Sequence, residues 1–535
     1  MMRRFLCLQL IWATIFCAQN LYARSNQSQF DVVVYGATPS GIMAAIAAAR
    51  GGLHVALVEP GRHIGGMVAS GLSHTDRGNT ETIGGIPREF FENVGRHYGE
   101  TVEWNFEPHV ATQVFADMLQ QAHVSVFTGA RLLKPNGVVK DARRIRRIVM
   151  EDGHTFSGAE FVDATYEGDL MEESGVSNTW GRESQAQYGE PLAGVLGTLR
   201  MDLQFRAKVS PYAADGSLLP GISAQPKGTL GQADKKIPSY NFRLCVTTDK
   251  DNQIPFPKPD GYDPWQYELL ARYLPILEKN LGRPLEMKDV FLMEILKGGK
   301  WDLNNMGAIS TDYTGMSWKF PTATYEERNA MLRQHFVYEA GLLYFLAHDP
   351  RIPSGLQALV RNYGLAKDEF TDTDHWPWQL YIRESRRMIG EYVFTQHDAL
   401  ENITKTDSVG MGSYQLDSHN VQRVVTADGF VENEGDYYVE TKPYEVPYRS
   451  IVPKPDEVVN LAVPVCMSAT HAAYGTIRQE PVYMILGQAA GTAVAVAFLE
   501  HRAVQDVPVA ELQTKLLRTH AVLHWTAADT KSAVQ

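Results

Sequence analysis

The chain has 535 residues, a formal net charge of −12, and 44% hydrophobic and 21% charged residues. This length allows more than one domain and a large core, and the acidic balance argues against a nucleic-acid-binding protein. Its four cysteines are too few for a disulfide scaffold, and no CxxC or Cys/His cluster predicts a metal site. Only Cys245 and Cys466 lie beyond the first 23 residues, and the sequence leaves their pairing open.

The first 23 residues have the pattern of a secretory signal peptide. Arg3 and Arg4 give a short basic start, residues 5–18 are mostly apolar, and Ala23 offers a small residue for cleavage. The apolar run is short for a membrane span, so a retained anchor or a buried first helix is the weaker alternative. We therefore expect a periplasmic or secreted protein without a stable membrane span, exported by either the Sec or the twin-arginine route.

Residues 30–58 predict a strand, a tight turn, a helix and a second strand. Residues 30–35 are a continuous β-favouring run, as in a strand buried on both faces. Residues 42–50 are rich in alanine, and residues 53–58 are again apolar. This order is the βαβ unit of a dinucleotide-binding fold, with a ligand-free βαβ unit as the alternative.

The turn GATPSG at 36–41 approximates the glycine pattern that holds a pyrophosphate. Gly36 permits the sharp turn, Gly41 lets the helix pack closely, and the helix N-terminus attracts phosphate. Thr38 stands where a glycine is usual, and its hydroxyl can partly compensate because it can itself bond a phosphate. Glu59 follows about twenty residues later, where a carboxylate accepts hydrogen bonds from a ribose.

A second glycine cluster follows in GRHIGGMVASGL at 61–72. Gly65, Gly66 and Gly71 would let the backbone approach a flat group further along the cofactor. A flavin that extends through the protein needs such a loop, whereas a nicotinamide cofactor on a simple Rossmann domain usually does not. A flexible surface loop is the alternative.

Further elements return the chain to this first sheet. Residues 107–122 predict a helix, 124–128 a strand, 137–156 a β meander and 161–165 another buried strand. We place the end of this part of the cofactor domain at residue 177.

Residues 178–457 are richer in aromatic residues and proline and predict an inserted domain of mixed α and β structure. We expect strands at 199–209 and 240–248 and helices at 325–347 and 380–392. In the last of these helices, Arg383 would share a face with Arg386 and Arg387.

The end of the chain repeats the first pattern. Residues 458–464 predict a central strand, and residues 479–501 predict a helix with Pro481 in its first turn. Gly487 and Gly491 give this helix a thin face that can lie close against the sheet, and its N-terminus would point N–H groups at an anion or a flavin carbonyl.

These pieces together resemble FAD-dependent oxidoreductases of the glutathione-reductase-like fold. More narrowly, they are similar to a family of secreted or periplasmic bacterial members that are sometimes labelled xanthan lyases. The motifs that carry the resemblance are VVVYGATPSGI, LVEPGRHIGGM, WNFEPHVATQVF, FVDATYEGDLM, RESRRMIGEYVFTQHD and SATHAAYGTIRQEPVYMILGQAAG. They extend over nearly the whole chain beyond residue 23.

The resemblance implies an α/β fold in which a Rossmann-like FAD-binding domain is built from both chain ends, 30–177 and 458–510, around a substrate domain at 178–457, with a tail at 511–535. It implies FAD as the cofactor and no second dinucleotide domain, so electrons would leave for an unknown acceptor. It places the following residues at the cofactor: Gly36, Thr38, Pro39, Ser40, Gly41, Glu59, Gly65, Gly66, Met67, Gly71, Asp163, Ala164, Thr165, Cys466, Met467, Pro481 and Val482.

Four residues are candidates for catalysis. His471 lies between the late strand and the closing helix, and His419 lies in the inserted domain; either could accept a proton while a hydride moves to the flavin. Arg478 precedes the closing helix, and Arg383 could face an acidic substrate or negative charge on the flavin. The alternatives are histidines that bond backbone groups and arginines on a solvated face.

The substrate prediction is a carbohydrate-like or other small polar molecule. It depends on the predicted export and on Trp301, Asn304 and Asn305, which could recognise a sugar by stacking and amide hydrogen bonds, or could instead form a turn with a buried indole. We therefore expect an FAD-dependent oxidoreductase. The alternatives are a polysaccharide lyase that acts on uronic-acid sugars and a non-catalytic FAD-binding protein.

Overall fold

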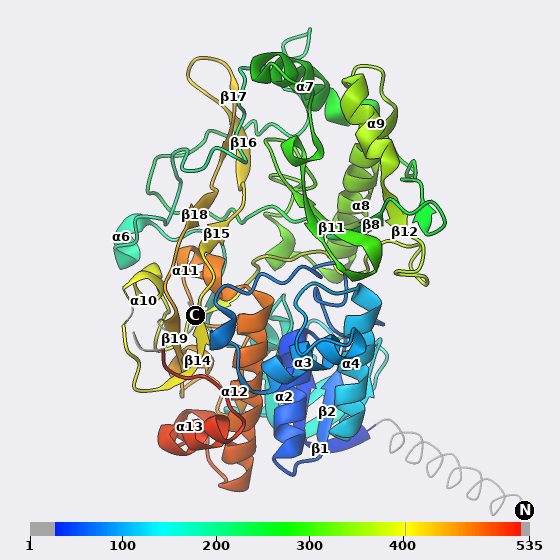
Figure 1. Ribbon diagram of the computed structural model, residues 1–535. Helices are drawn as coiled ribbons and strands as arrows, with labels where there is room; N and C mark the ends of the chain where they lie inside the picture. Colours follow the sequence, from blue (N-terminus) through cyan, green and yellow to red (C-terminus); the bar gives the residue numbers. More distant parts are fainter. Residues whose placement is uncertain (1–26, 402, 526–535) are drawn as a thin grey trace, which may run out of the picture.

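The computed structural model describes residues 27–401 and 403–525, so the predicted signal peptide lies outside the described residues. A sheet-and-helix domain formed by both ends of the chain lies at one end of the molecule, and the middle of the chain forms the other end (Figure 1). Both described cysteines are buried and free, so Cys245 and Cys466 form no bridge.

The first domain is built on a seven-stranded sheet in the order β3-β2-β1-β6-β5-β4, with β20 beside β6. Four neighbouring pairs are parallel, and the β4–β5 and β5–β6 pairs form the predicted antiparallel meander. The strands are β1 (Gln27–Tyr35), β2 (Val55–Val58), β3 (Ser125–Phe127), β4 (Val138–Asp141), β5 (Arg144–Val149), β6 (Thr155–Asp163) and β20 (Leu461–Ala462). The late strand therefore joins the sheet that the start of the chain forms.

Strand β1 is buried on both faces, as its sequence predicts. Val32 and Val34 belong to the large core cluster on one side of the sheet, while Val33 and Tyr35 belong to a second cluster on the other side. Successive side chains of a strand point to opposite faces, so an uninterrupted apolar run is what two packed faces require.

Two helices pack against each other on the first side of the sheet. They are α2 (Pro39–Arg50) and α12 (Glu480–Leu499). A Cβ atom at Gly487 would lie 2.1 Å from the Ser40 carbonyl oxygen, and one at Gly491 would lie 2.1 Å from the Ala44 carbonyl oxygen. The thin face of α12 therefore fits mainly against α2, not against the sheet as the sequence suggested.

The remaining helices of this domain are α3 (Gly85–His97), α4 (Pro108–Gln121), α5 (Asp169–Glu173) and α13 (Val509–Arg518). The predicted C-terminal tail thus begins inside a helix that packs on α12. Helix α12 is long and apolar enough to cross a membrane, but 83% of its most apolar window is buried in the fold, so it is a core helix. No other helix in the described ranges passes that test.

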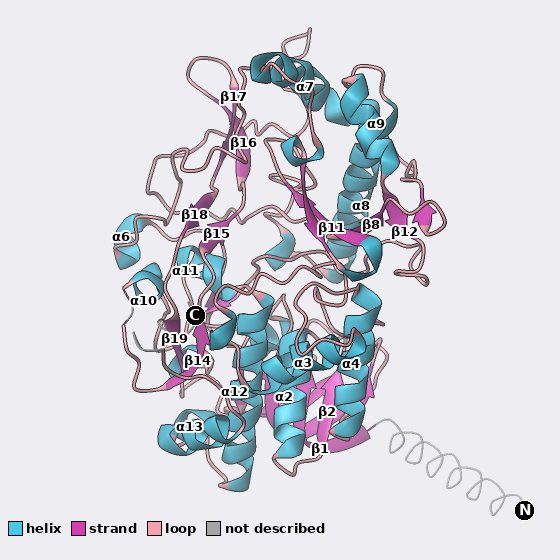
Figure 2. Ribbon diagram, in the orientation of Figure 1, coloured by secondary structure: helices cyan, strands magenta, loops and turns pink. Residues whose placement is uncertain are grey.

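The middle of the chain forms an antiparallel sheet in the order β10-β11-β8-β12-β9, flanked by long helices (Figure 2). Its strands are β8 (Leu244–Thr247), β9 (Gln253–Ile254), β10 (Phe291–Ile295), β11 (Lys300–Asn305) and β12 (Gly364–Ala366). Its helices are α7 (Glu268–Leu281), α8 (Tyr325–His348) and α9 (Ser354–Asn362). A capping box between Thr324 and Glu327 starts α8, which confirms the helix predicted at 325–347.

Four two-stranded pairs connect this part to the first domain. They are β7 (Asn178–Thr179) with β13 (Arg387–Met388), β14 (Ser408–Gly412) with β19 (Tyr444–Pro447), β15 (Leu416–Ser418) with β18 (Tyr437–Val439), and β16 (Gln422–Val425) with β17 (Val431–Glu434). Short helices α6 (Gln185–Tyr188), α10 (Gln396–Leu400) and α11 (His471–Ile477) lie beside them.

The prediction of a helix at 380–392 is wrong. The segment is irregular apart from the two residues of β13, and its three arginines are buried. Arg383 pairs with Asp312, Arg386 with Asp169 and Arg387 with Glu183. These partners belong to separate segments of the chain, and one solvated helix face could not place the three arginines beside them.

Two strand predictions also differ from the structure. Residues 199–209 form no strand: Leu199 and Met201 are exposed, and Arg200 bends back to pair with Asp202. The strand predicted at 458–464 shortens to the two residues of β20, which nevertheless lie beside β6 in the predicted sheet.

Candidate functional site

The turn between β1 and α2 has the backbone shape that a pyrophosphate site needs. Gly36 has a φ of +100°, and a Cβ atom there would lie 2.9 Å from the backbone nitrogen of Thr165. Pro39 occupies the first turn of α2, and Thr38 is the N-cap residue whose side chain accepts a hydrogen bond from the Gly41 nitrogen. The helix N-terminus is therefore presented as predicted.

The proton of the Thr38 hydroxyl is already used inside the protein and is not free to bond a phosphate. The hydroxyl donates its one proton to the Ala164 carbonyl oxygen at 2.7 Å and accepts from Gly41 at 3.2 Å. Ser40, in the same turn of α2, is buried, and its Oγ has no hydrogen-bond partner among the described residues. The open hydroxyl at this helix end is thus that of Ser40.

Glu59 lies at the end of β2 and joins both sides of the turn. Its carboxylate accepts hydrogen bonds from the Ala37 nitrogen at 2.6 Å and the Gly61 nitrogen at 2.7 Å. Burial raises its pKa to about 7. A carboxylate can accept further bonds beyond these two, so the predicted ribose contact fits this geometry.

A cavity of about 330 Å³ opens at this turn, which we call the cofactor cavity. The first domain lines it with Gly36, Thr38, Glu59, Gly66, Thr165 and Tyr166, and the middle part adds Tyr325, Arg328, Trp378, Leu380 and Ile382. The sequence did not single out these residues of the middle part, because nothing in their local pattern indicates which surface they approach.

The second glycine cluster crosses the N-terminus of α2. The Gly65 nitrogen donates to the Ala37 carbonyl oxygen at 2.7 Å, and a Cβ atom at Gly66 would lie 2.9 Å from the Cδ atom of Pro39. At Gly71, where φ is +103°, a Cβ atom would overlap the Arg243 carbonyl oxygen at 1.8 Å. The loop thus packs on the cofactor turn at one end and on the middle part at the other.

The DAT segment supports the cofactor cavity more than it faces it. Asp163 accepts bonds from the Thr165 nitrogen and hydroxyl and from the Met171 nitrogen, and burial raises its pKa to about 6. Cys466 packs behind this loop, with its sulfur 3.5 Å from the Thr165 carbonyl oxygen, and Met467 is buried in the core. Their predicted cofactor contacts stay predictions.

The two ends of the chain meet through a pair that the sequence analysis did not identify, Tyr166 and Glu480. The Tyr166 hydroxyl accepts from the Met67 nitrogen at 3.0 Å and donates to the Glu480 carboxylate at 2.7 Å. Glu480 begins α12, immediately before Pro481 and Val482. The glycine loop and the closing helix are therefore bonded to each other across the domain.

A second cavity, of about 530 Å³, lies between the first domain and the middle part, and we call it the polar cavity. Four arginines line it, with carboxyl, amide and phenol groups between them. Its lining includes Arg200, Arg243, Arg383, Arg478, Asp76, Asp202, Glu294, Asp417, His419, Asn304, Asn305, Tyr381 and Tyr414.

Three of the four predicted catalytic residues line this cavity: Arg383, His419 and Arg478. Arg478 donates to the Tyr381 hydroxyl at 2.7 Å and to the Asp417 carboxylate at 2.9 Å. The guanidinium of Arg383 lies 4.6 Å from the centre of the Tyr381 ring. The fold therefore brings together three predicted residues that lie up to 95 positions apart in the sequence.

His419 is held in a defined orientation. Its Nδ1 lies 2.8 Å from Asp312, and Arg383 lies 3.0 Å from the other oxygen of that carboxylate. Burial opposes ionisation of Asp312, but the charge of Arg383 lowers its pKa to about 2. Burial and the same arginine lower the pKa of His419 to about 4. A neutral His419 that donates from Nδ1 to an ionised Asp312 has an unprotonated Nε2, which lies 3.7 Å from Asp417.

His471 does not line the polar cavity. It begins α11 in a buried position, where its Nδ1 lies 2.7 Å from Glu384 and its backbone nitrogen donates to Glu183. Its Nε2 has no hydrogen-bond partner among the described residues. Its predicted catalytic role stays a prediction.

The WDLNN segment is split by the structure. Asn304 and Asn305 line the polar cavity, whereas the Trp301 ring packs edge-on against Tyr363, 5.5 Å away. Trp301 lies in strand β11 and is half-buried, so the alternative of a turn with a buried indole is wrong as well.

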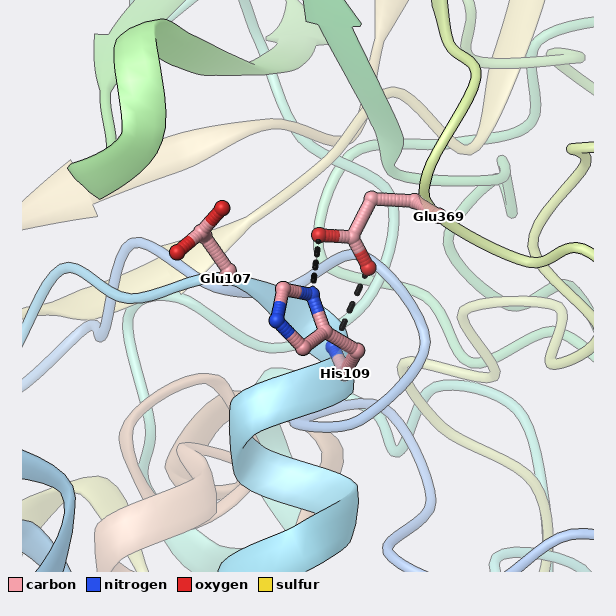
Figure 3. A group of neighbouring side chains, drawn as sticks. All are labelled: Glu107, His109 and Glu369. Atoms are coloured by element: carbon pink, nitrogen blue, oxygen red, sulfur yellow. Dashed lines mark hydrogen bonds and ion pairs between the residues drawn. The ribbon is translucent and has the colours of Figure 1, made fainter. Parts of the chain in front are cut away.

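One acidic cluster outside both cavities has the composition of a metal site: Glu107, His109 and Glu369 (Figure 3). The Nδ1 of His109 lies 2.7 Å from Glu369. The buried ammonium of Lys300 lies 2.8 Å from Glu107 and 2.7 Å from Glu369, so a cation already neutralises these carboxylates. The group is an ion-pair cluster that ties α4 to β11.

Comparison with known proteins gives one broad match. A family model described as FAD dependent oxidoreductase matches residues 31–516. A search of curated proteins found no match.

Solved structures match over about a third of the chain. The anhydrotetracycline hydroxylase OxyS of Streptomyces rimosus is 13% identical over 30% of this chain and 36% of its own, with a TM-score of 0.24. THI4 of Thermovibrio ammonificans is 23% identical over 32% of this chain and 73% of its own, with a TM-score of 0.23. The thioredoxin reductase of T. acidophilum is 19% identical over 30% of this chain and 41% of its own, with a TM-score of 0.17.

Proposed function

The chain belongs to the family of FAD-dependent oxidoreductases, and from this premise we propose that it dehydrogenates a small polar, carbohydrate-like substrate in the polar cavity. FAD is its cofactor, and the Gly36 turn, the Ser40 hydroxyl and the Glu59 carboxylate fit its ADP half. When bound, the flavin supplies the acceptor for two electrons.

The observation that carries the proposal is the position of the polar cavity next to the cofactor cavity. Leu380 and Ile382 line the cofactor cavity, while Tyr381 and Arg383 line the polar cavity. The two cavities therefore lie on either side of one short segment. Because hydride transfer needs direct contact, the proposal requires the flavin end of the cofactor to extend past this segment to a substrate bound among the polar groups.

The residues of the polar cavity can handle the proton of a dehydrogenation. Neutral His419, oriented by Asp312, presents Nε2 as a proton acceptor for a hydroxyl or an amine. Arg383 and Arg478 place positive charge near the cavity, which favours an anion that develops during proton removal. Asn304 and Asn305 offer amide groups for hydroxyl recognition.

We further propose that the protein is exported, because residues 1–23 have the signal-peptide pattern. Its electron acceptor would then be a periplasmic or extracellular component, and the substrate a molecule of that compartment.

The test is anaerobic reduction of the purified flavoprotein by a panel of sugars, polyols, amines and hydroxy acids, followed by visible absorbance. Bleaching of the flavin by a polar substrate, and a slower rate in Asn304→Ala, would support the proposal. New unsaturation in a uronic-acid polymer without bleaching would favour a lyase. A flavin that no class of substrate reduces would favour a non-catalytic FAD protein.

A further inference from the structure

The polar cavity, taken together with the direct partners of its arginines, has more carboxyl groups than guanidinium groups. Four arginines line it, whereas four carboxyl groups line it and two more, Asp302 and Asp312, bond directly to the lining arginines Arg243 and Arg383. Burial lowers the pKa of both His74 and His419, so the two histidines add no positive charge. Burial also raises the pKa of Asp76, and it raises that of Glu294 to about 8, so these two carboxyl groups ionise at neutral pH when a cation lies beside them.

Protein carboxylates already engage the arginines. Arg243 binds Asp302 through two hydrogen bonds of 2.8 and 2.7 Å, and Arg200 lies 2.6 Å from Asp202. Arg478 lies 2.9 Å from Asp417, a partner that it shares with Arg200. An anionic ligand would have to compete with these bonds, so the arginines are poorly available to hold one.

Asp76 is the exception among the carboxyl groups that line the cavity. Within the described residues no lysine, arginine or histidine nitrogen lies within 4.0 Å of it, and it accepts a single long hydrogen bond of 3.3 Å from the Tyr414 hydroxyl. Asp76 follows Gly71 by five positions, so the chain carries it from the glycine loop directly to the polar cavity.

Further hydrogen-bond acceptors line the same cavity. Glu294 and Asn304 lie on one face of the β10–β11 hairpin. In the antiparallel register, Asn304 lies opposite Leu292, and Leu292 and Glu294, two positions apart on β10, point to the same face. Asn305, at the end of β11, is only 5% exposed, and its Oδ1 has no partner among the described residues. A buried acceptor without a donor is costly unless a ligand supplies the donor.

We propose that the polar cavity binds a substrate that carries an ammonium group, which Asp76 and Glu294 hold as carboxylates that ionise beside it and the Asn305 amide oxygen holds by a hydrogen bond. An ammonium group supplies three N–H donors and one positive charge, which the two buried carboxyl groups and the unpartnered amide oxygen require. An amino sugar or an amino alcohol has this chemistry. The inference rests on the proposed function and narrows its substrate class.

The experiment measures binding by calorimetry at pH 7, with the flavin-containing protein kept anaerobic. Two matched pairs of probes differ only in an ammonium group against a hydroxyl: glucosamine against glucose, and 4-aminobutan-1-ol against butane-1,4-diol. We expect the ammonium member of at least one pair to bind at least tenfold more tightly than its hydroxyl partner.

Two variants and one control locate the site. Asp76→Asn and Glu294→Gln keep the size of each side chain and remove its ability to ionise beside the ligand, and each should weaken binding of the ammonium probe about tenfold, the scale of one charge-assisted hydrogen bond. Asp141→Asn removes an exposed carboxylate on β4, outside both cavities, and should change nothing. Flavin content and circular dichroism establish whether each variant is folded. If Asp76→Asn does not fold, the binding measured with Glu294→Gln tests the proposal.

The outcomes separate this inference from the proposed function. Equal binding within both pairs, no binding of either ammonium probe at millimolar concentration, or unchanged binding in the folded variants would overturn the inference. Binding of glucosamine through Asp76 by a protein whose flavin is never reduced would contradict the proposed function alone. Bleaching by a neutral sugar that also binds as tightly as its amine would contradict the inference alone.

Discussion

The two histidines that the sequence identifies have different surroundings. His419 lines the polar cavity and is oriented by Asp312, whereas His471 is buried against Glu384 away from that cavity. A proton acceptor must reach the proton that it removes, so the geometry favours His419. His471 is better placed to fix the position of α11 and of the segment that contains Glu384.

We expect His419→Gln to slow substrate-dependent flavin reduction by about 10²-fold or more, because general-base catalysis contributes on that scale. His471→Gln, a change of the same kind, should slow it less and should instead lower the thermal stability. Stopped-flow absorbance and thermal unfolding of the two flavin-loaded variants measure both effects. A larger rate loss in His471→Gln would assign the base to the other histidine.

A second prediction concerns Glu480. Burial raises its pKa to about 8, so the folded protein keeps a proton there that the unfolded chain releases near 4.5. Its contribution to stability is therefore present below about pH 4.5 and is lost as pH rises to about 8. A single such group changes the free energy of unfolding by up to about 1.4 kcal/mol per pH unit in this window.

Glu480→Gln removes this titration and keeps an acceptor for the Tyr166 hydroxyl. We expect urea unfolding at a series of pH values from 5 to 9 to show a smaller loss of stability in the variant than in the wild type. Parallel curves for the two proteins would contradict the pKa that burial gives Glu480. Other buried carboxyls titrate in both proteins and cancel in the comparison.

At the residue scale, the sequence predicts backbone requirements better than side-chain partners. Gly36 and Gly66 are found from local spacing, because a turn of this shape needs a missing Cβ wherever it occurs. The sequence does not indicate Asp76, because its proposed role in binding depends on the groups that surround it in the fold. Thr38 lies at the N-terminus of α2, but its hydroxyl bonds to Ala164, a residue 126 positions away that local spacing does not reveal.

Helices α2 and α12 pack extensively and closely against each other in the first domain. The Ala44 carbonyl oxygen lies where a Cβ atom on residue 491 would have to go, at 2.1 Å. Because α2 carries the cofactor turn and α12 the Glu480 bond to Tyr166, their separation would widen the cofactor cavity as well as loosen the core.

Gly491→Ala should therefore lower the free energy of unfolding by about 1–3 kcal/mol, the usual cost of overpacking, and lower the flavin content. Gly355→Ala is the matched control, since Gly355 lies in helix α9 with no atom within 4 Å of the added methyl group. The control should be neutral or slightly more stable, by about 1 kcal/mol at most. Denaturant unfolding and absorbance at constant protein concentration measure both variants, and equal behaviour would show that the helices can move apart freely.

Regular elements with strong periodicity or caps are predicted well, and irregular segments are not. The βαβ unit, α4, the meander, α8 and α12 all lie close to their expected ranges. Residues 380–392 contain good helix formers, but ion pairs with three distant segments override this preference. Tertiary partners of this kind cannot be identified from a single sequence.

At the scale of the whole molecule, the cofactor cavity has walls from separate parts of the chain. Gly36, Tyr166 and Trp378 belong to the start of the chain, the end of the first sheet and the middle part. A ligand that contacts all three residues binds the folded protein and not the unfolded chain. Bound FAD should therefore stabilise the whole fold.

Removal of FAD should lower the thermal unfolding temperature of the entire protein in one step, and FAD added back should restore it in a concentration-dependent manner. The stabilisation should approach about 2.7 kcal/mol when free FAD is a hundred times its dissociation constant. Differential scanning calorimetry of the stripped and reconstituted protein measures it. An unfolding temperature that does not respond to FAD would place the cofactor elsewhere.

The alternation along residues 380–383 makes this segment sensitive to a change in chain length. Leu380 and Ile382 line one cavity, and Tyr381 and Arg383 line the other. Inserting or deleting one residue just before this point would reverse the parity of the side chains that follow, exposing a guanidinium to the cofactor and an aliphatic group to the substrate. Homologous proteins that keep the same chemistry should therefore vary in composition here far more readily than in length.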